Sequence, residues 1–206
     1  MRISKVLLTG VAFLLVAALV NPFSSDRAQA TIVGTPHDLS ARGWGTNQVC
    51  IFCHTPHNAK TEQLAPLWNH ASTMSTFTPY SSGSLTAVVG QPTGNSKACL
   101  SCHDGTVALD SYGTRDGTNF IGSGSTNLGT NLSNDHPVSF TYDSALASAD
   151  GGLTTPASAS QVVAGIPLYA SQLQCASCHS VHENANGDFL RFSNAASDLC
   201  RKCHTK

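Results

Sequence analysis

Apolar residues are concentrated at the start of the chain and scattered through the rest of it. Residues 6–20 form an uncharged, mostly apolar run that follows Arg2 and Lys5 and precedes the small-residue sequence Ala28-Gln29-Ala30. This order is typical of a secretory signal peptide, and the run is shorter than the about 20 residues that span a bilayer. We therefore expect residues 1–30 to be a cleaved signal peptide, with no membrane span in the mature chain.

After residue 30, the apolar positions follow neither a helical nor a strand period over more than a few residues. Gly, Ser, Thr and Asn interrupt almost every stretch, most densely between residues 110 and 160. Residues 138–142 alternate as in a short strand, and residues 195–202 predict a short helix. The pattern predicts a mostly coil protein with short helices and few strands, in which side chains alone would form a weak core.

Four copies of the sequence Cys-x-x-Cys-His use all 8 cysteines. In a c-type haem site, the two thiols bond to the haem vinyl groups and the His binds the iron. Zinc ribbons and disulfide frameworks require no His after every second Cys, and a thioredoxin-like site requires only one motif. The sequence therefore predicts four covalently attached haem c groups that dominate the core. The attachment residues are Cys50, Cys53, Cys99, Cys102, Cys175, Cys178, Cys200 and Cys203, and the proximal iron ligands are His54, His103, His179 and His204.

The other histidines recur in the same order in two repeat-like halves of one domain, residues 31–206. Each half, residues 31–110 and 130–206, has an upstream His, a Cys-x-x-Cys-His-x-x-His sequence and a plain Cys-x-x-Cys-His, and a Gly/Ser/Thr-rich stretch joins the halves. His70 has no counterpart in the second half and is either a surplus residue or a substitute for His37. The repeat predicts four distal iron ligands, which are His37, His57, His136 and His182.

His57 and His182 each lie three residues after a proximal His. Residues three apart on a helix are neighbours, with Cβ atoms about 5–6 Å apart, so they cannot easily bind opposite faces of one haem. We expect each of them to bind the iron of a neighbouring haem, giving two close haem pairs, one in each half.

Two axial histidines close the iron to substrates, which favours electron transfer over catalysis. The sequence contains no Cys-x-x-Cys-Lys motif, so we expect an electron carrier, with a multihaem reductase as the less favoured alternative. Charged residues make up 11% of the chain, against about 25% in a usual soluble domain, and such a surface resists association poorly. Nothing in the composition indicates a nucleic-acid surface.

Five short sequences resemble the paired Cys-x-x-Cys-His multihaem cytochromes of metal-reducing bacteria. They are His37-Asp38-Leu39-Ser40, Cys53-His54-Thr55-Pro56-His57-Asn58, Pro66-Leu67-Trp68-Asn69-His70, Cys99-Leu100-Ser101-Cys102-His103-Asp104-Gly105 and His136-Pro137-Val138-Ser139-Phe140. With four motifs in this order, nearly all of the mature chain is similar to the OmcE-type tetrahaem cytochromes. That family forms extracellular filaments with a continuous haem chain, which carries electrons to external acceptors such as metal oxides.

The resemblance implies an exported homopolymer at the cell surface or outside the cell, which exchanges electrons with other multihaem cytochromes and external acceptors. A monomeric tetrahaem shuttle in the periplasm is the alternative. In such filaments, one distal His can come from the neighbouring subunit. His37 is one candidate because it would lie seven residues into the mature chain, and His70 is the competing candidate.

Overall fold

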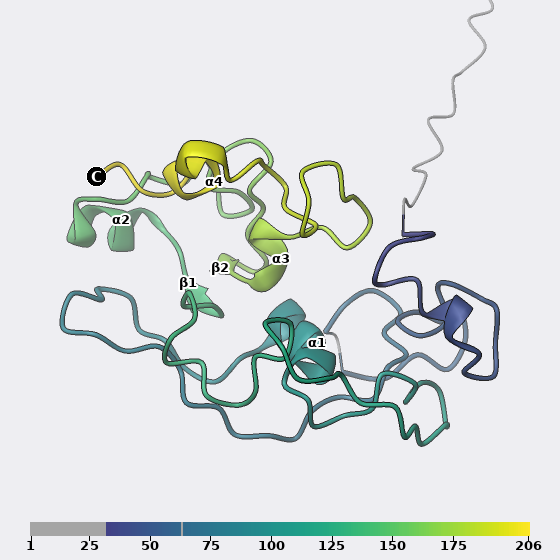
Figure 1. Ribbon diagram of the computed structural model, residues 1–206. Coiled ribbons are helices and arrows are strands. Elements are labelled where there is room, and N and C mark those ends of the chain that lie inside the picture. Colours follow the sequence, from purple (N-terminus) through teal and green to yellow (C-terminus); the bar gives the residue numbers. More distant parts are fainter. Residues whose placement is uncertain (1–31, 63) are drawn as a thin grey trace, which may run out of the picture. The chain divides into compact units, whose positions relative to one another are not determined.

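The computed structural model describes residues 32–62 and 64–206, and most of this part is coil (Figure 1). The predicted signal peptide lies outside the described residues. Among the described residues, no helix has the length and apolar composition needed to cross a membrane. The expected mostly coil fold with short helices and few strands is confirmed. In chain order, the elements are η1 (Leu39–Arg42), α1 (Gly94–His103), β1 (Phe140–Thr141), α2 (Ser144–Asp150), β2 (Gln172–Leu173), α3 (Cys175–Cys178), η2 (Ala195–Ser197) and α4 (Asp198–Arg201).

The strand predicted at residues 138–142 is present in shortened form as β1. It pairs antiparallel with β2, and Phe140 lies opposite Leu173. The helix predicted at residues 195–202 is interrupted, because Ala196 and Ser197 have φ angles of 50° and 61°. Two successive residues in the left-handed region cannot continue a right-handed helix, so η2 and α4 are separate short elements.

The longest helix, α1, buries mainly small and polar residues. Ser96, Ala98, Leu100 and Ser101 are all buried, and these positions do not follow the single apolar stripe of an ordinary amphipathic helix. The helix ends before Gly105, whose φ of 75° suits glycine and where a Cβ would lie 2.8 Å from the Asn127 side chain. The α1 helix is therefore packed on several sides, and its last turn carries the second Cys-x-x-Cys-His motif.

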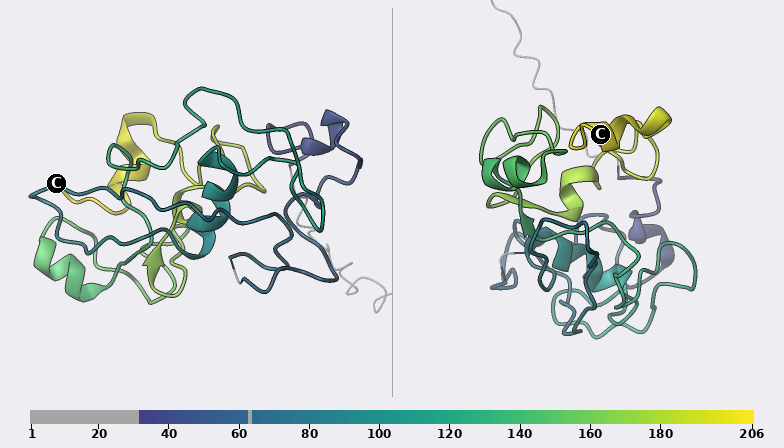
Figure 2. Two further views of the ribbon diagram at one scale, coloured as in Figure 1. Left: turned by 90° about the horizontal axis from the view of Figure 1, so that it is seen from below. Right: turned by 90° about the vertical axis from the view of Figure 1, so that its left-hand side faces the viewer.

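The buried apolar side chains form three separate clusters. One lies in the second half around the β1–β2 pair, and two smaller clusters lie on either side of α1. The α1 and α3 helices are packed against each other, so the second and third motifs are neighbours (Figures 1 and 2). The clusters consist of Phe140, Tyr142, Val162, Ile166, Leu168 and Leu173; of Leu64, Trp68 and Ala98; and of Phe77, Leu100 and Leu132.

Candidate haem attachment sites

The four Cys-x-x-Cys-His motifs have closely similar backbone turns. The first motif is a hydrogen-bonded turn, the second is the end of α1, the third begins with α3, and the fourth includes the end of α4. In the first, third and fourth motifs, the His N–H donates to the carbonyl of the first Cys, at 2.8, 3.0 and 2.9 Å. A single helical turn places residues three apart on the same side. Each motif therefore presents its two thiols together, with the His directly after them.

Main-chain carbonyls hold the rings of three proximal histidines. The Nδ1 atom lies 2.6 Å from the Pro66 oxygen in His54, 2.7 Å from the Thr126 oxygen in His103 and 2.9 Å from the Asp188 oxygen in His179. An Nδ1–H that donates to a carbonyl leaves the Nε2 lone pair free, which is the arrangement of a histidine that binds a metal through Nε2.

Left-handed turns and isolated bridges contribute to this placement. Asp188, whose carbonyl faces His179, has a φ of 47°, a conformation that costs a non-glycine residue about 1–2 kcal/mol. Strain of this kind is often found at functional sites. Isolated antiparallel bridges also hold the backbones of proximal histidines, and they join His54 to Trp68, His179 to Leu190 and His204 to Leu153.

Three proximal histidines each face one of the expected distal histidines. The ring centres are 6.0 Å apart for His37 and His103, 6.1 Å for His54 and His182, and 6.3 Å for His136 and His204. An imidazole nitrogen lies about 2 Å from a bound metal, and the ring centre about 1 Å beyond it, so two rings on opposite sides of one metal have centres about 6 Å apart. The spacing of all three pairs suits a metal between the rings.

The His37 ring has features that suit a metal ligand. It is half-buried, and its buried Nδ1 makes no hydrogen bond within the described part of the chain. Burial, together with the nearby His103 and His179, lowers the pKa of His37 to about 4. The ring is therefore neutral at ordinary pH, which is the protonation state that binds metals.

Burial lowers the pKa of His136 and His182 in the same way. The paired His204 and His54 lower these two pKa values further. These shifts favour the neutral form of both distal rings, which is the form that binds iron.

The His182 ring faces the proximal His of the other half of the chain. It therefore lies beside a motif other than its own. The contact with His54 joins the two halves, whereas we expected a pair within each half. Each upstream His, by contrast, faces the plain motif of its own half. His57 and His179 are both exposed, and no ring contact involves either of them among the described residues.

A family model described as the doubled CXXCH motif matches residues 168–206, which contain the third and fourth motifs. The match indicates a multihaem c-type cytochrome. Proteins of this kind attach haem c covalently and carry electrons. No curated protein matches the chain.

The thiols of the four motifs lie in surroundings that suit an apolar macrocycle. Burial raises the pKa of Cys53 and of Cys203 to about 11, and it also raises the pKa values of Cys102 and Cys178. Low-dielectric surroundings of this kind disfavour a thiolate but accommodate a neutral thioether. Together with the three histidine pairs, they show that the residues present fit covalently bound haem.

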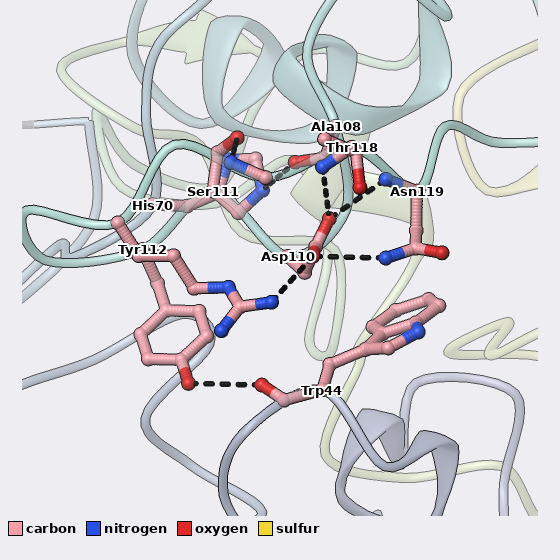
Figure 3. A network of polar contacts seen from close by, with 10 residues as sticks. Trp44, His70, Ala108, Asp110, Ser111, Tyr112, Thr118 and Asn119 are labelled. Atoms are coloured by element: carbon pink, nitrogen blue, oxygen red, sulfur yellow. Dashed lines mark hydrogen bonds and ion pairs between the residues drawn. The ribbon is translucent and has the colours of Figure 1, made fainter.

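His70 lies in a polar network (Figure 3). Its ring contacts Trp68, and no ring contact joins it to a proximal His in the described part of the chain. It is 1% exposed, with Nδ1 2.7 Å from the Ala71 oxygen and Nε2 3.1 Å from the Ala108 oxygen. The Cys102 sulfur lies 3.5 Å from Nε2. Since both ring nitrogens face main-chain carbonyls, neither is directed at a space where iron could bind.

Asp110 organises the loop next to His70 (Figure 3). Its Oδ1 accepts the N–H groups of Thr118 and Asn119, and its Oδ2 accepts from the Asn119 amide and the Arg115 guanidinium at 2.9 and 3.1 Å. Burial by itself raises the pKa of Asp110, but the hydrogen bonds from Asn119 and Arg115 outweigh it and hold the pKa at about 2. The sequence pattern gave no sign of this role, because Asp110 begins a stretch that reads as a polar low-complexity segment.

Proposed function

We propose that the protein is a tetrahaem electron carrier in which each haem iron has two histidine ligands. The observation that carries this proposal is the set of three proximal–distal ring pairs with centres 6.0 to 6.3 Å apart. Bound haem c supplies one-electron oxidation and reduction at its iron. The chain supplies eight thiols for attachment and closes the axial positions with imidazoles, which excludes substrates and favours transfer over catalysis.

The internal repeat assigns the fourth pair of ligands. In the repeat, His54 and His179 occupy equivalent positions, and so do His57 and His182. The observed pair of His54 with His182 therefore implies an equivalent pair of His179 with His57. Eight of the nine histidines then act as ligands in this proposal. The remaining one is His70, both of whose nitrogens face carbonyls.

Mass spectrometry and visible spectroscopy of the purified holoprotein test this proposal. We expect a mass that exceeds that of the polypeptide by four haem groups, and low-spin spectra for the haems whose two histidines pair within the chain. Carbon monoxide should bind at no more than one haem, the one assigned to His57 and His179. Fewer haems, or carbon monoxide binding at several irons, would contradict the carrier assignment and favour a reductase.

We propose further that copies of the chain polymerise into a filament outside the cell, which delivers electrons to external acceptors and exchanges them with other multihaem cytochromes. The resemblance to filament-forming tetrahaem cytochromes supports this, as do the signal-like sequence of residues 1–30 and the charged fraction of 11%. Covalent haem attachment outside the bacterial cytoplasm agrees with export. A soluble periplasmic shuttle is the outcome that the test below must exclude.

The fourth ligand pair suggests how subunits join. His57 and His179 are exposed and make no ring contact with each other in the described chain, so we propose that His57 of one subunit pairs with His179 of the next. A contact between two different surfaces repeats without closing and generates a filament. This assignment replaces His37 as the donor across subunits, because His37 faces His103 of its own chain.

Electron microscopy of the sheared cell-surface fraction distinguishes these possibilities. We expect filaments from the wild type and from the control Pro56→Ala, which changes an exposed neighbour of His57, and none from His57→Ala. Dilute wild-type monomers should bind carbon monoxide at one haem, and filaments should not. Normal filaments of His57→Ala would exclude donation across subunits, and absence of wild-type filaments would favour the periplasmic shuttle.

A further inference from the structure

The second and third attachment motifs begin on two helices whose N-termini meet. Helix α1 carries Cys99 and Cys102, and α3 carries Cys175 and Cys178. The two helices belong to different halves of the chain and lie side by side (Figure 1). Their junction is therefore where the halves of the molecule are joined next to two haem sites.

At this junction, each helix caps the other. The Gln174 side-chain oxygen accepts the Ser96 N–H of α1 at 3.1 Å, across a separation of 78 residues. In return, the Ser96 hydroxyl oxygen accepts the Cys175 N–H of α3 at 3.0 Å. The first N–H groups of a helix have no partner within it, and the side chain of Thr93, the N-cap residue of α1, makes no capping bond. Each side chain thus accepts a hydrogen bond from an N–H group in the first turn of the other helix.

A second layer of hydrogen bonds holds Gln174 in place. The Ser139 hydroxyl donates to its side-chain oxygen at 3.0 Å, and its amide nitrogen donates to the Gln172 side-chain oxygen at 2.9 Å. Ser96 and Gln174 are 0% and 2% exposed. A fully satisfied, buried polar network of this kind favours one arrangement, because any displacement leaves a buried group without a partner.

The reciprocal caps lie directly next to the thiols. Cys99 is one helical turn after Ser96, and Cys175 follows Gln174. The two thiols lie close enough to affect each other, since Cys175 raises the pKa of Cys99 and Cys99 lowers the pKa of Cys175. The caps therefore determine where the first thiol of each motif lies relative to the other.

We propose that Ser96 and Gln174 are positioning residues that fix the mutual orientation of the second and third haem groups. This inference rests on the proposed tetrahaem function. The network joins the two halves next to two attachment thiols, so its geometry sets how one attachment site faces the next. Electron transfer between redox groups falls steeply with distance and depends on their orientation, which gives these two polar side chains a role beyond stability.

Soret circular dichroism of the holoprotein tests the proposal, because coupling between neighbouring haems produces a signal that depends on their orientation. Ser96→Ala and Gln174→Leu should both change the shape of this signal. Ser96→Thr keeps the hydroxyl acceptor for the Cys175 N–H and should retain the wild-type shape. The control is Asp110→Asn at neutral pH, which perturbs another buried polar network and should lower the melting temperature without changing the signal.

The outcomes separate the inference from the function on which it rests. An unchanged Soret signal in both Ser96→Ala and Gln174→Leu, with four low-spin haems present, would overturn the positioning role and leave the carrier function intact. The same change in Asp110→Asn would also overturn it, since the effect would then follow stability alone. If Gln174→Leu does not fold, the smaller Ser96→Ala change decides. A wild-type protein without covalent haem would instead contradict the proposed function itself.

Discussion

Two histidines of the first half, the half-buried His37 and the buried His70, differ in what their ring nitrogens face. His37 faces His103 and has an Nδ1 that makes no hydrogen bond in the described chain, whereas both nitrogens of His70 face carbonyls. We predict that His37→Ala converts one haem to a high-spin form that binds carbon monoxide. We predict that His70→Ala keeps every haem in its wild-type spin state and lowers the free energy of unfolding by about 1–3 kcal/mol, through lost buried hydrogen bonds.

Electron paramagnetic resonance of the oxidised protein and carbon monoxide difference spectra of the reduced protein measure these two outcomes. The variants are matched, since each removes one imidazole from the first half of the chain. A new high-spin haem in His70→Ala would show that His70 is a ligand and would exclude the assignment made here.

Asp110 should make stability depend on pH in the acidic range. Its pKa is lowered from the ordinary value of 3.8 to about 2, so its contribution is present above about pH 4 and is lost as the pH falls through about 2. Since one pKa unit corresponds to about 1.4 kcal/mol, we predict that Asp110→Asn lowers the free energy of unfolding by about 2 kcal/mol at pH 6.

Urea unfolding of the holoprotein at several pH values measures this difference. The gap between wild type and Asp110→Asn should narrow between about pH 4 and pH 2. The control Asp116→Asn changes an exposed carboxylate of the same loop and should leave the free energy within about 0.5 kcal/mol of wild type. A gap that stays constant down to pH 2 would contradict the assigned role of Asp110.

At the scale of elements, the sequence best predicted the helices and strands whose formation depends on a short stretch of neighbouring residues. The alternation at residues 138–142 predicted β1. The predicted helix at residues 195–202 was interrupted by the left-handed Ala196 and Ser197, neither of which is a glycine that would signal such a conformation. The caps between Ser96 and Gln174 were missed because their partners are 78 residues apart and no local pattern records such a contact.

The histidines show the same difference between what local sequence order predicts and what depends on long-range packing. Their order along the chain predicted a set of distal ligands but not their partners, and the pairs of His37 with His103 and of His136 with His204 come from the structure. The contact of His182 with His54 depends on how the halves pack, which the repeat alone did not determine. The tract after Asp110 was interpreted as a flexible low-complexity stretch, but the structure shows that a buried carboxylate organises its first part.

The irregular segment before β2 contains a side-chain core that should be sensitive to truncation. Ile166 is fully buried, in a turn whose backbone bonds join it to Val162 and Val163. We predict that Ile166→Ala lowers the free energy of unfolding by about 2–4 kcal/mol, the usual range when a large buried aliphatic side chain is removed. The control Val88→Ala, at a residue 91% exposed, should change it by about 0.5 kcal/mol or less.

Chemical denaturation of the two variants, followed by far-ultraviolet circular dichroism, compares their free energies. Equal effects of Ile166→Ala and Val88→Ala would indicate that the apolar cluster contributes little and that the haem groups alone support this half of the chain.

At the scale of the whole molecule, the short elements and separate apolar clusters indicate a fold that depends on its cofactors. We predict that the chain produced without haem attachment is largely unfolded, as is common for domains whose site forms part of the core. Nuclear magnetic resonance should show a narrow amide dispersion, and heating should give no cooperative transition. A dispersed spectrum of the haem-free chain would show that the polypeptide folds without its cofactors.

The two-residue strands of the β1–β2 pair have a consequence for aggregation at high protein concentration. Long, flat strand edges allow copies of a protein to add to one another through their backbones and to aggregate. In the described part of this chain, the named strands expose edges only two residues long. A protein with few charges to keep its copies apart can therefore be concentrated with little risk of amyloid-like pairing through these edges.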